Sequence, residues 1–167
     1  NDRRLGRLAT IDTRLVHDLP IPKGLLRDGT NKLSIVAPKA TDDIEVGDFW
    51  IAPGPRKTAL GQAWIEVSVR DAIPCRITVT DEKGHLAALH SGKTDTLALR
   101  PGGAYTGDGS AQLGVWPGRY TVYASRGFEY SVAQKQVTVA VGETAVVPLE
   151  IRREVPTPNL VACDTHI

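Results

Sequence analysis

The chain has 167 residues, with 20 Lys or Arg against 19 Asp or Glu, so its formal net charge at pH 7 is +1. A charge this close to zero provides no long-range field to attract nucleic acid or an anionic membrane, and we expect neither as a partner. Hydrophobic residues make up 41% of the chain, which is ordinary for a globular protein. No apolar run approaches the roughly 18 residues that a membrane-spanning helix needs.

The first 57 residues predict a small β segment followed by a linker. Short apolar runs predict three strands, over residues 33–36, 44–46 and 49–51. Two prolines and a glycine within residues 52–57 break regular structure and predict the linker. We therefore expect a domain boundary near residue 58.

Residues 58–153 predict an antiparallel β-sandwich. Apolar and polar side chains alternate, with many β-branched residues, over residues 65–69, 77–80, 120–124, 137–141 and 145–151. This period of two places one face of each strand in a core and the other in water. Turns that contain glycine separate the runs, at residues 81–84, 116–119 and 141–144. Strands at this spacing, with no helical pattern between them, favour a sandwich over an α/β sheet.

Residues 154–167 predict a second linker and the first strand of a further domain. Pro156 and Pro158 end the sandwich, and an apolar run then leads to Asp164, Thr165 and His166. On a strand, residues two apart share a face, so Asp164 and His166 would point to the same side. A carboxylate and an imidazole placed together in this way can begin a metal site. One strand cannot complete it, because a zinc site needs about three or four protein ligands.

The sandwich resembles a known family. Residues 64–151 resemble the carboxypeptidase-regulatory, transthyretin-like fold. The resemblance is carried by the opening residues 77–84, the Pro117-Gly118-Arg119-Tyr120 element and residues 126–130. Fibronectin-like sandwiches are the alternative. Residues 15–51 resemble the closing strands of a galactose-binding-like jelly roll, which implies that residues 1–57 form a partial, jelly-roll-like β segment.

The last residues resemble the opening of the polymerase-and-histidinol-phosphatase (PHP) metallohydrolase domain, whose first strand ends in Asp-x-His-x-His. The chain ends at Ile167, where the next residue would be the second His. The order of the elements is similar to that in the CehA/McbA branch of this superfamily: a sandwich, then a Pro-containing linker, then such a strand. The resemblance implies that His166 and Asp164 serve a divalent metal, zinc, manganese or iron, within the complete parent domain only.

Other candidate site residues have simpler alternatives. His85 and His90 flank a short apolar segment without a third ligand to join them, so we expect solvated turn residues, and the same holds for His17. The three tryptophans could form a sugar-stacking platform, but packing is the usual role of Trp in a sandwich; they are Trp50, Trp64 and Trp116.

The cysteine count leaves the redox compartment open. Cys75 and Cys163 are far apart in sequence and neither belongs to a CxxC pair. A disulfide between them is possible in an oxidising compartment, although we expect two reduced thiols. The chain has no Met, which indicates a piece of a longer protein.

These patterns lead to two functional hypotheses. The first is a non-catalytic accessory β-sandwich region of a larger PHP-like hydrolase of phosphoesters or carboxylic esters. Its partner would be the adjoining catalytic domain of the same polypeptide, and this chain alone would be inactive and without a cofactor. The second is a carbohydrate-binding or adhesion module of a secreted or surface protein.

Overall fold

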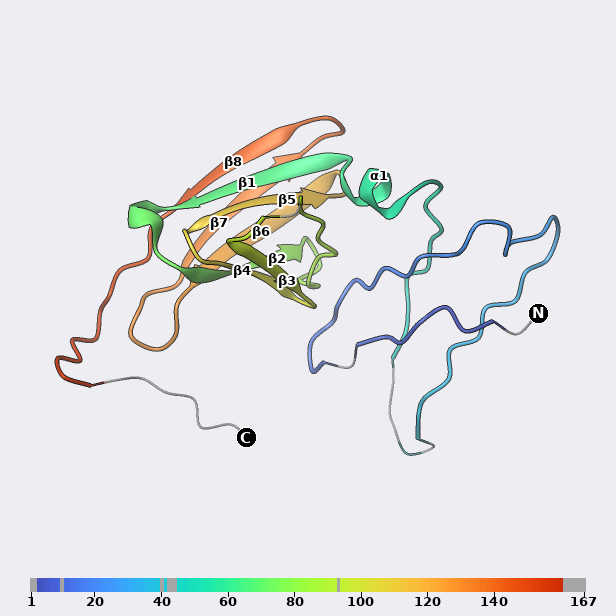
Figure 1. Ribbon diagram of the computed structural model, residues 1–167, viewed down its shortest axis with the longest axis horizontal. Coiled ribbons are helices and arrows are strands. Elements are labelled where there is room, and N and C mark those ends of the chain that lie inside the picture. Colours follow the sequence, from blue (N-terminus) through green and yellow to red (C-terminus); the bar gives the residue numbers. More distant parts are fainter. Residues whose placement is uncertain (1–2, 10, 40, 42–44, 93, 161–167) are drawn as a thin grey trace.

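The structure is a computed structural model that describes residues 3–9, 11–39, 41, 45–92 and 94–160 (Figure 1). The regular elements of these residues are one short helix, a 3-10 turn and eight strands. In chain order they are α1 (Arg56–Leu60), β1 (Ala63–Val69), η1 (Arg70–Ala72), β2 (Cys75–Asp81), β3 (Leu97–Arg100), β4 (Gly103–Thr106), β5 (Ser110–Val115), β6 (Gly118–Ser125), β7 (Ala133–Val139) and β8 (Thr144–Leu149). Within this described part, no helix is long and apolar enough to cross a membrane.

The strands form two facing sheets. One sheet has three strands in the order β5-β1-β8, and the other has five in the order β3-β4-β2-β6-β7. All neighbouring pairs are antiparallel except β1 and β8, which are parallel with Ile65 opposite Ala145. The exception follows from the connectivity: β8 arrives from the other sheet after β7, so it is not a hairpin partner of β1. The predicted all-β sandwich is therefore confirmed, with one parallel pair.

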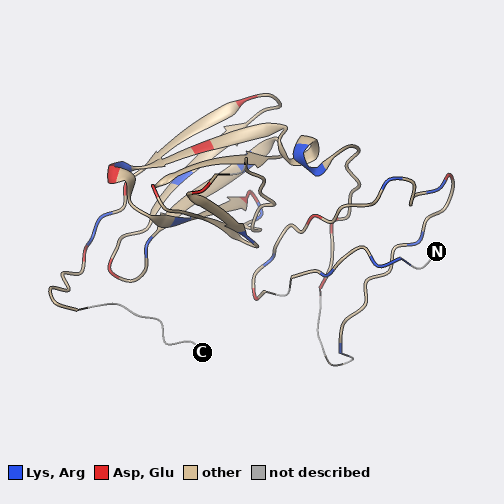
Figure 2. Ribbon diagram, viewed as in Figure 1, with Lys and Arg blue, Asp and Glu red and all other residues tan. Residues whose placement is uncertain are grey.

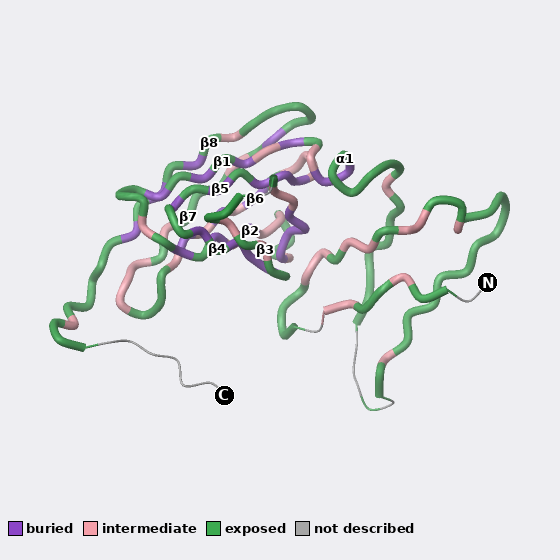
Figure 3. The backbone as a smooth tube through the Cα atoms, in the orientation of Figure 1, coloured by how far each residue is buried: buried purple, intermediate pink, exposed green. Residues whose placement is uncertain are grey.

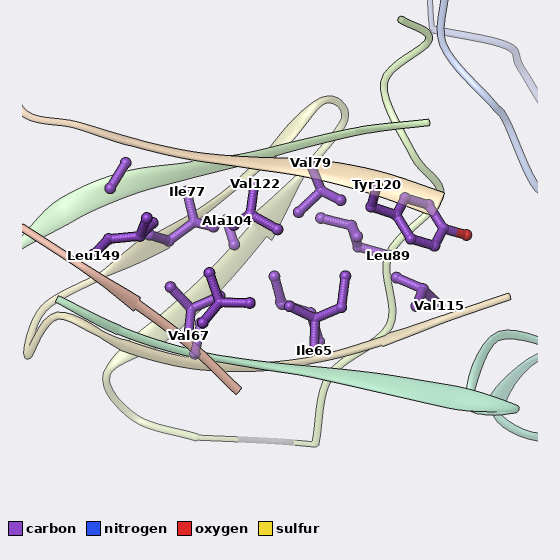
Figure 4. Packing of buried hydrophobic residues seen from close by; sticks show 14 of the residues in the cluster. Ile65, Val67, Ile77, Val79, Leu89, Ala104, Val115, Tyr120, Val122 and Leu149 are labelled. Carbon is purple, nitrogen blue, oxygen red and sulfur yellow. The ribbon is translucent and has the colours of Figure 1, made fainter. Parts of the chain in front are cut away.

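The core lies between the two sheets and is built from alternate residues of each strand. Every second side chain of β1, from Ala63 to Val69, is buried, and β2 alternates in the same way. Ile65 and Val67 meet Ile77 and Val122 from the opposite sheet (Figure 4). Four of the strands, β1, β2, β6 and β8, follow the predicted alternation, because burial of one face selects the period-two register. Strand β7 overlaps its predicted run only at residues 137–139, since it begins at Ala133, and Val141 is exposed in the turn that follows.

Strands β3, β4 and β5 were not predicted. They occupy most of residues 97–115, where four glycines within residues 102–109 favour turns. Ala104 in β4 and Leu113 in β5 are fully buried, so packing stabilises strands in a stretch with weak local preference. Helix α1 was also missed, since its first residues were assigned to the linker.

The predicted strands of the N-terminal segment, residues 3–55, are not observed. The described residues of 33–36, 45–46 and 49–51 have no strand pairing, and Ile44 lies outside the described residues. Their apolar side chains are exposed, Val36 by 81% and Ile51 by 69%. A strand needs a partner strand for its hydrogen bonds, and the described residues around these runs supply none. Figure 3 shows buried residues concentrated in the sandwich instead.

Candidate functional site

The predicted metal-site residues Asp164 and His166 lie outside the described residues. The chain that leads toward them is described as far as Leu160. It leaves the sandwich at the end away from the N-terminal segment (Figure 1). We call residues 150–157 the exit linker, because this stretch follows β8 and carries the chain away from the sandwich.

The exit linker is fixed to the loop between β6 and β7. The backbone carbonyl of Glu129 accepts hydrogen bonds from the amides of Glu154 at 2.8 Å and Val155 at 3.2 Å. The Glu129 carboxylate binds the Arg153 guanidinium at 2.5 Å and accepts a hydrogen bond from the Thr157 hydroxyl at 2.7 Å. A single loop residue thus contacts the linker at successive points along its path, and the direction in which the chain leaves is set.

Electrostatics support this attachment. The hydrogen bond from Thr157, followed by that from Arg153, holds the pKa of the Glu129 carboxyl below its ordinary value. The carboxylate is therefore charged at neutral pH and remains an acceptor. At the start of the linker, Glu150 makes ion pairs with Arg70 and Arg152 and its pKa is lowered by those hydrogen bonds.

His90 lies at a different place, where helix α1 and the N-terminal segment meet the sandwich. Its backbone exchanges two hydrogen bonds with Gly114, and its ring lies 6.3 Å from that of Trp64. The Nε2 atom is buried and has no hydrogen-bond partner among the described residues. Burial, followed by the positive charges of Arg56 and Lys57, lowers the pKa of the His90 imidazole. His90 is thus a packed, neutral side chain. The prediction that it is a solvated turn residue is therefore wrong.

His90 should make folding sensitive to mild acid. Its pKa is depressed only in the folded state, so its contribution to stability is present above about pH 6.5 and is lost as the pH falls toward the folded pKa. Chemical denaturation at a series of pH values measures the free energy of unfolding. Its slope against pH in mild acid should be shallower for His90→Leu than for the wild type. Gln134→Leu, on an exposed residue of β7 that carries no titratable group, should keep the wild-type slope. Equal slopes for His90→Leu and wild type would contradict this assignment.

The other histidines are held separately. His85 Nδ1 lies 3.3 Å from the Asp81 carboxylate, while His17 Nε2 accepts a hydrogen bond from the Ala9 amide at 2.9 Å. Within the described ranges, no three His, Cys, Asp or Glu side chains gather in a group that could hold a metal ion.

The tryptophans do not form one platform. Trp50 and Trp116 pack edge to face with ring centroids 4.9 Å apart, which fastens the N-terminal segment to the sandwich. Trp64 lies on β1 beside His90 instead. Two ion pairs add to this attachment. Lys83 of the sandwich lies 3.1 Å from the Asp48 carboxylate of the N-terminal segment, and Arg56 of α1 pairs with Asp18 of the same segment.

Cys75 is buried at the start of β2 and has no disulfide partner among the described residues; Cys163 lies outside them. Burial raises the pKa of the Cys75 thiol, an effect that the nearby Arg126 guanidinium opposes. Arg126 and Arg76 line a hollow beside this thiol. Sequence reasoning missed both this hollow and the Glu129 contacts, since each joins residues that are distant in sequence.

Comparisons with known proteins identify no family. No protein-family model matches the sequence, and no curated protein matches it. Among solved structures, the chain is similar to a minor pilin of the Gram-positive pathogen Streptococcus agalactiae, with 17% identity and a TM-score of 0.41. The similarity covers 60% of this chain and 48% of the pilin, so the chain spans about half of that protein.

Proposed function

We propose that this chain is a non-catalytic accessory β-sandwich region of a larger metal-dependent hydrolase that resembles the PHP superfamily. The sandwich orients a catalytic domain that follows it in the same polypeptide. The observation that carries the proposal is the attachment of the exit linker to Glu129. A linker held by both the backbone and the side chain of a loop residue transmits the position of the sandwich to whatever follows.

The donor types at the end of the sequence agree with this proposal. Asp164 and His166 provide an oxygen and a nitrogen donor two residues apart, a combination that suits zinc, manganese or iron. A bound divalent metal supplies Lewis acidity and lowers the pKa of a water ligand. In the complete domain, His166 would bind the metal and Asp164 would bind it or orient a ligand. The substrate class is a phosphoester or a carboxylic ester.

The test is to express the protein through the domain that follows His166. Bound metal is measured by elemental analysis, and hydrolysis is measured with generic aryl phosphate and carboxyl ester substrates. We expect stoichiometric metal and turnover, both of which His166→Ala should abolish, whereas His17→Ala should retain them. Absence of metal and turnover from the folded, extended protein would refute the proposal. Specific binding to a glycan array under those conditions would favour the carbohydrate-binding alternative.

Glu129→Gln is expected to loosen the exit linker while leaving the sandwich folded. The amide cannot form the ion pair with Arg153, and it accepts a weaker hydrogen bond from Thr157 than a carboxylate does. Amide exchange at Glu154 and Val155 should become severalfold faster, as hydrogen exchange followed by NMR would report. The matched control is Glu154→Gln, on an exposed neighbour in the same linker. Exchange that accelerates equally in both variants would contradict a specific role for Glu129.

A further inference from the structure

A hollow lined in part by two arginines lies at the same end of the sandwich as the exit linker. It has a volume of about 520 Å³ and is open to solvent, and its walls come from the start of β2, the end of β4 and the end of β6. Its lining side chains include two arginines, three hydroxyl groups and a thiol: Arg76, Arg126, Tyr105, Thr106, Ser125 and Cys75. The lining residues include no Asp or Glu in the described part of the chain.

Sheet register sets the arrangement of this hollow. Arg76 of β2 lies directly opposite Tyr105 of β4 on one side and Ser125 of β6 on the other. The three side chains therefore form a row on the outer face of the five-stranded sheet, since paired residues of neighbouring strands point to the same side. The Arg76 guanidinium lies 5.9 Å from the centre of the Tyr105 ring, and Tyr105 is 48% exposed.

Both arginines have few hydrogen-bond partners among the described residues. A guanidinium has five N–H groups; Arg76 donates to the Gly102 carbonyl at 3.4 Å, and Arg126 donates to the Pro74 carbonyl at 2.6 Å. Neither forms a salt bridge with a carboxylate in the described ranges, whereas Glu129, on the same loop as Arg126, is bound to Arg153. The Arg126 guanidinium also lies 5.4 Å from the centre of the Tyr130 ring, which orients it.

We propose that this hollow binds a small ligand that carries a tetrahedral oxyanion, as in a phosphate or sulfate ester. Two guanidiniums without a described carboxylate partner supply the charge and the forked donors that such a group requires. The hydroxyl of Ser125 adds a donor, and the exposed ring of Tyr105 offers a flat surface for the group to which the anion is attached. This site goes beyond the proposed scaffolding function and does not depend on it.

The test is an NMR titration of the isotopically labelled chain with phenyl phosphate, phenyl sulfate, inorganic phosphate and phenol. We expect saturable shifts at the amides of Arg76, Tyr105 and Arg126 with the three anions and none with phenol. A preference for phenyl phosphate over phenyl sulfate, or the reverse, identifies the ester. Shifts with phenol equal to those with phenyl phosphate, or no saturable shift with any anion, would overturn the proposal.

Substitutions locate the site. Arg126→Ala should weaken phenyl phosphate binding about tenfold, as expected for loss of a charged hydrogen-bond donor. Arg126→Lys keeps the positive charge but loses the paired N–H donors of the guanidinium, so it should weaken phenyl phosphate binding less than Arg126→Ala does. The matched control is Arg119→Ala, an exposed arginine at the other end of β6, which should bind as the wild type does. Unchanged core amide shifts verify folding, and an equal loss in Arg119→Ala would indicate nonspecific attraction and overturn the assignment.

Discussion

Ile65→Ala is expected to lower the free energy of unfolding by about 3–4 kcal/mol. Ile65 is fully buried in the middle of β1 and faces the opposite sheet (Figure 4). The substitution removes three carbon atoms from a site whose walls are rigid strands, so a cavity adds to the lost transfer free energy. Urea denaturation followed by tryptophan fluorescence measures the loss, and the thermal midpoint should fall by roughly 15–25 °C.

The control for Ile65 is Val146→Ala in the neighbouring strand β8. Val146 pairs with the residue after Ile65 in the parallel ladder, but its side chain is 62% exposed. Truncating it removes little buried area, so the loss should be at most about 1 kcal/mol. Losses of equal size in the two variants would show that the core does not lie between these two sheets.

Gly109→Ala should have the second-largest effect, a loss of about 2–3 kcal/mol. Gly109 has a φ of +71°, and a Cβ atom there would lie 3.0 Å from the backbone carbon of Ala72 and the nitrogen of Ile73. The neighbouring backbone cannot move aside easily, because Asp71 and Ala72 already adopt left-handed conformations at the corner between β1 and β2. The Gly109 carbonyl also accepts a hydrogen bond from the Val69 amide at 2.7 Å.

Gly142→Ala separates backbone strain from this close contact. Gly142 has a φ of +79°, but a Cβ atom at this position would meet no described heavy atom within 4 Å beyond its chain neighbours. The variant should lose only about 1 kcal/mol, the cost of a left-handed alanine. Denaturation curves of the two variants, measured under identical conditions, give the difference. A Gly109→Ala variant no less stable than Gly142→Ala would mean that the corner shifts freely.

The arrangement of charges agrees with the near-zero net charge of the sequence. Figure 2 shows basic and acidic residues interspersed over the sandwich and the N-terminal segment. The hollow at Arg76 and Arg126 is a local departure from this balance, since its lining includes two arginines and none of the described acidic residues. Net charge is a sum over the chain, so it carries no information about such local groups.

Alternation in the sequence determined the main strands of the sandwich. The period-two runs in β1, β2, β6 and β8 reflect a strong burial constraint, and Gly84 and Gly142 mark turns where a positive φ is required. The run Ala111, Leu113 and Val115 carries the same pattern for β5 and could have been found. These features are local, so the residues themselves encode them.

Only the tertiary structure decided which strands pair and which side chains meet. The parallel pairing of β1 with β8 joins the first and last strands, and the apolar runs of residues 33–36 and 49–51 lack a described partner and form no strand. Glu129 meets Arg153, and Arg76 meets Tyr105, across long separations in sequence. Strand pairing and side-chain contact depend on the positions of distant segments, and no local pattern of residues specifies those positions.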